Sequence, residues 1–229
     1  MAFAPSCVNI KNRPLYVHVL ADFDETRAVE WFMALDYGYA HYTVCLLACR
    51  DGDGNVFVVD EHAARMWLPQ RHCGAILAML TRHGLTDRDI RRFVAGTDVF
   101  SRQSDGQTIA GQYKRHGVLL SAANMDRING WAEVRQAFGE PQCGLLSGSA
   151  PAEGNTQADA VRPKLFIHER CRRLIETLPI LQHDPSRSED VLKVDADEDG
   201  VGGDDAADCL RYLLATKARS VQVRKLSGL

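Results

Sequence analysis

The sequence lacks several motifs that would fix its chemistry at once. Its 229 residues contain no Gly-Lys dipeptide, which excludes a Walker A loop and ATP hydrolysis by a P-loop. Its eight histidines show neither HExxH nor HxxxH spacing, and its seven cysteines form no CxxC pair, so a zinc site of the usual kind is not expected. An odd number of cysteines without a secretory signal indicates a reducing compartment.

Long apolar runs are absent too. The runs at 17–21 and 44–49 are far shorter than the ~18 residues that span a bilayer. The N-terminus has no basic region followed by an apolar core, so we expect neither a membrane segment nor a secretory signal. A composition of 45% hydrophobic and 25% charged residues is typical of a globular protein with one sizeable domain.

The net charge of −3 hides an uneven distribution. Residues 65–135 carry eleven basic and six acidic side chains, whereas residues 184–208 carry ten acidic and two basic ones. A basic middle could hold a polyanion and an acidic segment could hold metal ions. Two solvated faces would explain the same charges.

Apolar segments in the first half of the chain alternate with turn sequences. Glycine and aspartate at 37–40 and 51–54 favour tight hairpins, so we expect three consecutive antiparallel strands. Beyond them, helical spacing and strand patterns alternate, which is typical of parallel pairing. The expected strands are 29–35, 43–49, 56–59, 92–95, 118–122 and 164–168, and the expected helices are 69–83, 105–116, 126–138, 169–177 and 204–217.

This order predicts an α/β domain with a mixed central sheet flanked by helices, the outline of an RNase H-like (resolvase/integrase-type) fold. We assign the domain to residues 29–219, after a lead-in segment at 1–28 with one short strand around 15–20. Residues 140–162 are rich in Gly, Ser, Ala and Pro and predict a long flexible loop. Residues 220–229 form a C-terminal tail.

Five aspartates stand at the ends of predicted elements. Asp36 and Asp98 each end a strand, and Asp204, Asp205 and Asp208 open the last helix at spacings that place pairs on one face. Carboxylates that meet at one edge of a sheet repel one another unless divalent cations hold them. Oxygen ligands favour Mg²⁺ or Mn²⁺ over zinc, so the arrangement predicts a two-metal site.

The same acids could instead have structural roles. Asp36 could begin a turn, and the aspartates of the last helix could cap it. Residues 195–200 match the first six positions of an EF-hand calcium loop, but the twelfth position is Ala206, where glutamate is needed, so we interpret them as an acidic turn near the metal site. Asp60 and Glu61 follow a predicted strand, either at the rim of the site or at a solvated strand end.

Six short segments carry a family resemblance. They are 34–39 (Ala-Leu-Asp-Tyr-Gly-Tyr), 58–61 (Val-Val-Asp-Glu), 95–98 (Ala-Gly-Thr-Asp), 108–110 (Thr-Ile-Ala), 123–131 (Ala-Asn-Met-Asp-Arg, then Gly-Trp) and 203–212 (Gly-Asp-Asp-Ala-Ala-Asp-Cys-Leu-Arg-Tyr). In this order they resemble the C-terminal nuclease domain of tailed-bacteriophage large terminase subunits. Cys209 stands where alanine is usual, and Val99-Phe100 replaces the common Pro-Ala or Pro-Ser. The family's ATPase half has no counterpart here, so the chain resembles an isolated nuclease domain.

The resemblance implies that Asp36, Asp98 and Asp205 are catalytic and bind two divalent cations, Mg²⁺ or Mn²⁺. Asp204 and Asp208 would be further metal ligands, and Asp205 takes the primary role because its spacing from Asp208 matches that of the related resolvases. The implied chemistry is in-line hydrolysis of a DNA phosphodiester, with one metal activating water and the other stabilising the leaving 3′ oxygen. The cut would separate a packaged viral genome from its concatemer.

Basic side chains are expected to contact double-stranded DNA through phosphates, without reading sequence. The main candidates are Arg102, Arg127, Lys114, Arg115 and Arg92, followed by Arg88, Arg91, Arg170, Arg172 and Arg173. In the full-length protein the resemblance implies an ATPase domain, a portal and a small terminase subunit as partners, in the host-cell cytoplasm. The alternative of another class is a catalytically silent RNase H-like module that binds only DNA or motor partners, and retention of all the acids favours the enzyme.

Overall fold

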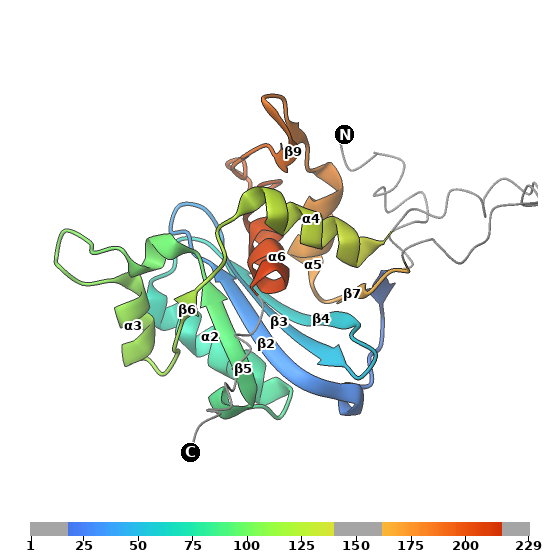
Figure 1. The fold of residues 1–229 in the computed structure, drawn as a ribbon. Helices are drawn as coiled ribbons and strands as arrows, with labels where there is room; N and C mark the ends of the chain where they lie inside the picture. The colour runs from blue at the N-terminus through green and yellow to red at the C-terminus, as the bar shows by residue number, and fades with distance from the viewer. Residues whose placement is uncertain (1–17, 140–161, 217–229) are drawn as a thin grey trace, which may run out of the picture.

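A computed structural model describes residues 18–139 and 162–216, and a seven-stranded sheet forms the centre of this part of the chain (Figure 1). The strand order is β1-β7-β4-β3-β2-β5-β6. Strand β3 is antiparallel to both neighbours and the other pairs are parallel, so the predicted mixed sheet is confirmed. The strands are β1 (Val19–Leu20), β2 (Ala28–Asp36), β3 (Thr43–Asp51), β4 (Val56–Ala64), β5 (Ile90–Ala95), β6 (Ser121–Ala122) and β7 (Leu165–His168).

Helices cover both faces of the sheet, which explains why its central strands are apolar on both sides. In β2, Phe32 and Ala34 pack on the side of α4, α5 and α6, whereas Met33 and Leu35 pack on the side of α2 and α3 (Figure 1). The helices are α2 (Pro69–Arg82), α3 (Ile109–Arg115), α4 (Arg127–Phe138), α5 (Arg172–Thr177) and α6 (Asp205–Ala215), with short 3-10 turns η2 (Glu25–Arg27), η3 (Asp87–Asp89), η4 (Thr97–Phe100) and η5 (Leu178–Ile180).

Helix α6 lies against β2, β3 and β5, and nine of its eleven residues are buried. Helix α4 packs closely on it because Gly130 has no side chain: a Cβ there would lie 2.8 Å from Cγ of Arg211. The later turns of α6, around Arg211 and Ala215, thereby pack directly on α4.

Several predicted boundaries are wrong for local reasons. Helix α3 begins four residues later than expected, because the Asp105 carboxylate and Gly106, with φ of 78°, form a turn first. The strand expected at 118–122 is reduced to β6, because the amide of Val118 bonds back to the end of α3. Helix α5 begins at Arg172 because the preceding residues form a turn.

Strand β4 continues to Ala64, five residues beyond the predicted end. Asp60 and Glu61 therefore lie inside a strand, so the solvated strand end considered for them is wrong. A second, two-stranded sheet pairs β8 (His183–Asp184) with β9 (Arg187–Val191), where no strand was predicted. Its polar Ser-Glu-Asp sequence hides the strand pattern.

The short strand predicted around 15–20 is seen as β1, at the edge of the central sheet beside β7. The described residues do not include positions 15–17 of the predicted lead-in strand, 140–161 of the predicted loop, the end of the last predicted helix at 217 or the predicted C-terminal tail. No helix in the described ranges is long and apolar enough to cross a bilayer.

Candidate metal centre

Asp36 is the last residue of β2 and follows two fully buried residues, Ala34 and Leu35. Burial raises the pKa of its carboxyl well above the usual value, and the negative charges of Asp208, Asp205 and Asp98 raise it further. The ammonium of Lys193 acts in the opposite direction and lowers it. Asp36 is therefore a strand-end carboxylate among other carboxylates, as predicted.

Asp98 lies in η4, just beyond the end of β5, and its side chain is exposed. Gly96 separates it from α6: a Cβ on Gly96 would lie 2.6 Å from Oδ1 of Asp98 and 3.4 Å from the Tyr212 hydroxyl. The Ala-Gly-Thr-Asp sequence thus lets the Asp98 carboxylate fold back toward the helix, because any larger residue at position 96 would displace it.

The remaining aspartates belong to the first turn of α6. Asp204 precedes the helix, and its backbone oxygen accepts a hydrogen bond from the amide of Asp208 at 2.8 Å. Burial raises the pKa of both Asp204 and Asp205. Oδ2 of Asp204 is buried, and the ammonium of Lys193 lies 3.3 Å from it as an ion-pair partner.

Asp208 differs from the other four because cations surround it. Nη1 of Arg127 lies 3.1 Å from its Oδ2, Nε of Arg211 lies 3.1 Å from its Oδ1, and Lys193 forms a close ion pair with it. Burial by itself would raise the pKa of Asp208, but Arg211, Lys193 and Arg127 together lower it. Asp208 thus links α6 to α4 and to the segment after β9.

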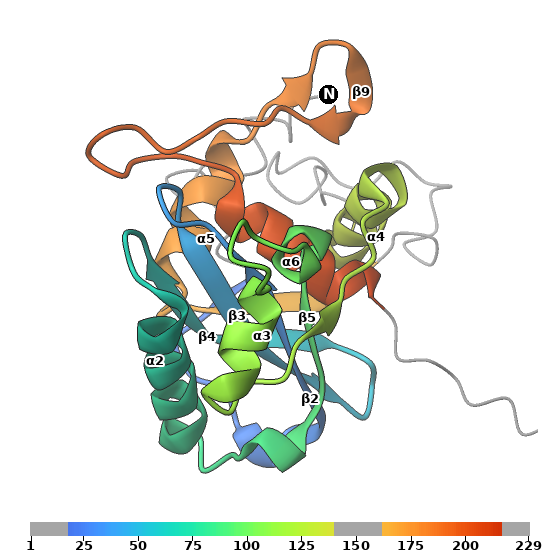
Figure 2. The ribbon, with the colours of Figure 1, turned by 90° about the vertical axis from the view of Figure 1, so that its left-hand side faces the viewer.

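Lys193 is a cation that pairs with two of these aspartates, and sequence reasoning did not single it out. Its Nζ lies 3.3 Å from Oδ2 of Asp204 while it also pairs with Asp208. Its side chain is 63% exposed, so it reaches the acids from the solvent side. A signal was available: it is one of only two basic residues in the acidic stretch 184–208. Figure 2 shows the β8–β9 hairpin, and the segment that leads from it to α6, at the end of the molecule where α6 begins.

As they stand, the described ranges contain no group of three or more His, Cys, Asp or Glu side chains arranged to hold a metal ion. The donor chemistry nevertheless fits divalent cations. The donors are carboxylate oxygens, one of them the buried Oδ2 of Asp204, and the partly buried Asp36 lies among like charges. Lys193 supplies positive charge at the place where such cations would bind.

The acidic turn at 195–200 is tied down by arginines. Arg65 donates to the backbone oxygens of Asp197 at 3.1 Å and Glu198 at 2.5 Å, and Arg173 donates to that of Gly200 at 3.0 Å. Backbone carbonyl oxygens of this turn thus accept hydrogen bonds from guanidinium groups. This supports its interpretation as a structural turn beside the carboxylates rather than a calcium loop.

Glu61 has a structural contact that the sequence did not suggest. Its carboxylate accepts hydrogen bonds from the amides of Arg173 and Leu174 at 2.9 and 2.8 Å, at the start of α5. Asp60 points to the other face of β4, where it pairs with Arg82 and His83. Neither acid belongs to the group around Asp36.

The predicted DNA-binding residues fall into two groups. Arg102, Lys114 and Arg115 are exposed. Arg92 bonds to Glu30 and to a backbone oxygen of α6, with 9% of its side chain exposed. Arg127 donates to both carboxylate oxygens of Asp190, at 2.8 and 3.0 Å, as well as to Asp208.

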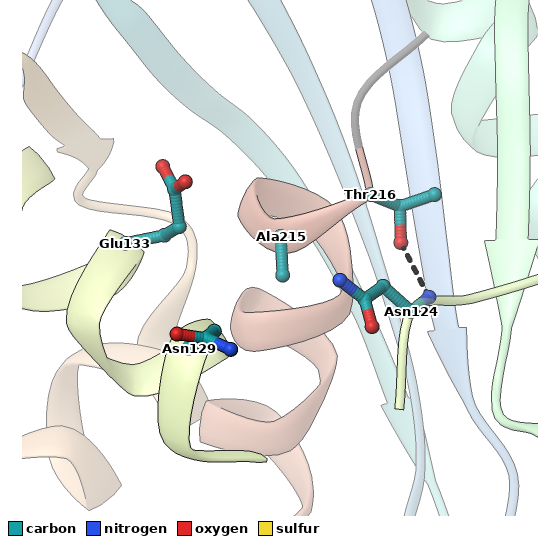
Figure 3. Close-up of a pocket in the computed structure, with 5 residues that line it drawn as sticks. All are labelled: Asn124, Asn129, Glu133, Ala215 and Thr216. Atoms are coloured by element: carbon teal, nitrogen blue, oxygen red, sulfur yellow. Dashed lines mark hydrogen bonds between the residues drawn. The ribbon is translucent and has the colours of Figure 1, made fainter. Parts of the chain in front are cut away.

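A surface pocket of about 410 Å³ lies at the far end of α6, between that helix and α4 (Figure 3). It is lined by Asn124, Asn129, Glu133, Ala215 and Thr216, and the Thr216 hydroxyl accepts a hydrogen bond from the Asn124 amide at 2.9 Å. None of the five aspartates contributes to it, so the pocket is separate from the candidate centre.

No family model and no curated protein matches this sequence. Solved structures do match. The P22 large terminase nuclease domain gives a TM-score of 0.61 at 15% identity, covering 90% of this chain and 89% of that chain. The large terminase from a thermophilic bacteriophage gives 0.61 at 13% identity, covering 87% of this chain and 42% of that chain. The same thermophilic phage protein in complex with ATP-gamma-S gives 0.62 at 14% identity, covering 88% and 43%.

This chain therefore spans about two fifths of the thermophilic phage protein and nearly the whole P22 domain. At such low identities the likeness concerns the fold alone. The mixed sheet with helices on both faces is the arrangement that these structures share with the described part of the chain. The chain has the RNase H-like fold of the nuclease domain of phage large terminases.

Proposed function

We propose that this protein is a metal-dependent, largely sequence-independent DNA endonuclease that cuts concatemeric viral DNA during genome packaging. The observation that carries the proposal is the position of Asp36: a partly buried strand-end carboxyl whose pKa is raised by burial and by the charges of Asp208, Asp205 and Asp98. Such an excess of negative charge in a protein interior is costly unless cations neutralise it. Perturbed carboxyls of this kind are typical of functional sites.

Asp36, Asp98 and Asp205 are the proposed catalytic ligands of two divalent cations, Mg²⁺ or Mn²⁺, with Asp204 as a further ligand. Bound there, the cations would supply water activation and stabilisation of the leaving 3′ oxygen. Asp205 is preferred over Asp204 because its charge raises the pKa of Asp36. Asp208 was also predicted as a ligand, and its three cationic partners support a role in holding α6 in place.

Phosphate contacts are proposed for the exposed Arg102, Lys114 and Arg115. Arg102 is four residues after Asp98, on the segment of chain that leaves the candidate centre. Arg92 and Arg127 stay candidates, although a phosphate would have to share them with their present carboxylate partners. Because such contacts release counterions, the logarithm of the DNA affinity should fall with that of the salt concentration, with a slope of about −0.9 per phosphate neutralised.

The likeness to large terminases supports a wider proposal about context. In the whole protein an ATPase domain would accompany this domain, the portal and the small terminase subunit would be partners, and the host-cell cytoplasm would be the place of action.

The direct test is incubation of the purified protein with supercoiled plasmid and Mn²⁺ or Mg²⁺. We expect nicked and linear products with either metal and none in EDTA. The pair Asp205→Asn and Asp204→Asn assigns the primary ligand, since the first should lose more activity than the second. DNA binding without cutting at any metal concentration would instead support the catalytically silent module.

A further inference from the structure

Arg173, in the first turn of α5, joins the last loop to the start of α6. Its Nη1 donates to the backbone oxygen of Gly200 at 3.0 Å, and its Nη2 donates to that of Gly202 at 2.7 Å. The same Nη2 lies 3.4 Å from Oδ2 of Asp205. One guanidinium thus connects three points of the 200–205 segment that leads into the proposed metal ligands.

Arg173 is itself held in place from two directions. Its guanidinium stacks on the ring of Tyr42, 3.5 Å from the ring centroid, and only 11% of its side chain is exposed. Its backbone amide donates to the carboxylate of Glu61 at 2.9 Å, so this side chain of β4 anchors the start of α5. A side chain with these contacts has little freedom to turn outward toward a DNA phosphate.

The loop itself is shaped around this arginine. Gly203 has a φ of 93°, and a Cβ there would lie 3.0 Å from Oδ2 of Asp205 and 3.1 Å from Nη2 of Arg173. At Gly200, with a φ of 83°, a Cβ would lie 2.5 Å from the Tyr42 hydroxyl. Both glycines adopt a backbone conformation that other residues avoid, and both leave no space for a side chain.

We propose that Arg173 is a positioning residue of the nuclease site, which fixes the 200–205 loop and the Asp205 carboxylate for a divalent cation without contacting DNA. This inference rests on the function proposed above and replaces the phosphate contact expected for Arg173 from its basic character. The physical reason is that a largely buried carboxylate needs a charged partner to keep one orientation. Partners that orient metal ligands typically affect metal affinity by roughly 10- to 100-fold.

The test compares Arg173→Gln with Arg172→Gln in the full chain. Each removes one positive charge from α5, but Arg172 is exposed, which makes it the matched control. We expect Arg173→Gln to raise the Mn²⁺ concentration for the half-maximal Tm increase by roughly 10- to 100-fold. Its affinity for fluorescent duplex DNA in EDTA should stay within about twofold of wild type. Arg172→Gln should leave the Mn²⁺ response unchanged, and Arg173→Lys should recover part of it.

Two results would overturn the inference while leaving the proposed function intact. One is a wild-type Mn²⁺ response in Arg173→Gln. The other is a DNA-binding salt slope that Arg173→Gln reduces by about 0.9, as the loss of one phosphate contact would. If Arg173→Gln does not fold, Tyr42→Leu removes the stacking surface instead, and an unchanged Mn²⁺ response there overturns the inference equally. A wild-type protein that neither responds to Mn²⁺ nor cuts DNA overturns both proposals together.

Discussion

Two aspartates of the central sheet, Asp36 on β2 and Asp60 on β4, have carboxyl pKa values that are shifted in opposite directions. Oδ2 of Asp60 lies 2.9 Å from both Nε2 of His83 and Nη2 of Arg82. Despite burial, these hydrogen bonds from His83 and Arg82 lower the pKa of Asp60 to about 2. Burial and neighbouring carboxylates instead raise the pKa of Asp36.

The difference separates an acid that pairs with cations of the fold from one that we propose binds a metal ion. At Asp60 the fold supplies its own cations, and Glu25 completes the pairing from the other side of the His83 ring at 2.6 Å. At Asp36 the fold supplies more carboxylates than cations, with Lys193 as the cation that acts on it. Burial of a carboxylate does not by itself indicate a binding site. A carboxylate indicates one when the charges around it do not balance its own.

The largest expected effect is on catalysis. Asp36→Asn and Asp98→Asn should each reduce plasmid cutting in Mn²⁺ by at least about 100-fold, because losing a ligand should exceed the loss of an orienting partner. Circular dichroism should show an unchanged fold. Asp60→Asn is the control, because Asp60 is the aspartate that we assign a structural role. The folded fraction of this variant should still cut the plasmid. Wild-type cutting by either site variant would contradict the assignment.

The next effect concerns stability, where substitution of Asp60 should cause a larger loss than substitution of Asp36. Asp60→Ala should lower the free energy of unfolding by roughly 3 to 5 kcal/mol, because it leaves the imidazole of His83 and the guanidinium of Arg82 without their buried partner. Urea titration at pH 6 measures this. Asp89→Ala, at an exposed turn, is the reference and should lose far less. Equal losses in the two variants would mean that the Asp60 cluster does not hold the fold.

Metal should sharpen the contrast. An Asp36 whose folded-state pKa is raised above 3.8 destabilises the fold when ionised, so at neutral pH Asp36→Asn should melt higher than wild type in EDTA. Asp98→Asn should shift the same way by less, because its side chain is exposed. A cation that binds only the folded state adds about 2.7 kcal/mol at one hundred times Kd, and both variants should gain less than that. A lower Tm in EDTA with a full Mn²⁺ response would indicate structural aspartates.

The smallest effect is the pH dependence of the His83 pairing. Hydrogen bonds to Asp60 and Glu25 raise the pKa of His83 above 6.5. Its stabilisation is fully present below the unfolded pKa and is lost as pH rises through the folded pKa. The lowered pKa of Asp60 contributes above 3.8 and is lost only as pH falls toward about 2, so it does not change over the same range. Between pH 6 and 9, wild type should therefore lose more stability than His83→Gln, and equal losses would argue against a charged His83.

The sequence predicts the parts of the molecule that depend on local pattern. The apolar runs around Phe32 and Leu46 locate the central strands, and the glycine after α2 locates its end. Asp36, Asp98 and Asp205 stand where the motifs indicate, at a strand end, just past a strand and at a helix start.

Partners far apart along the chain could not be predicted in this way. Glu61 meets Arg173 across 112 positions, and Arg127 meets Asp190 across 63. These contacts depend on which faces of α4 and α5 point into the protein, and the local hydrophobic periodicity of the sequence does not indicate which partners they meet there. The β8–β9 hairpin was missed because its residues are polar, and the length of β4 was missed because acids replace its apolar residues after Val59.

The docking of α6 also bears on how the protein folds. Its Asp205 is 169 positions from Asp36, whereas the centre of the sheet that receives it, β2-β3-β4, is built from consecutive hairpins. Contacts between residues so far apart in sequence form late in folding, because the chain loses loop entropy before these contacts can stabilise it. Nuclease activity should therefore return only in the slowest refolding phase, after the sheet signal in circular dichroism has recovered. A chain that is still being synthesised would then carry Asp36 and Asp98 before Asp205, and therefore without the complete set of proposed metal ligands.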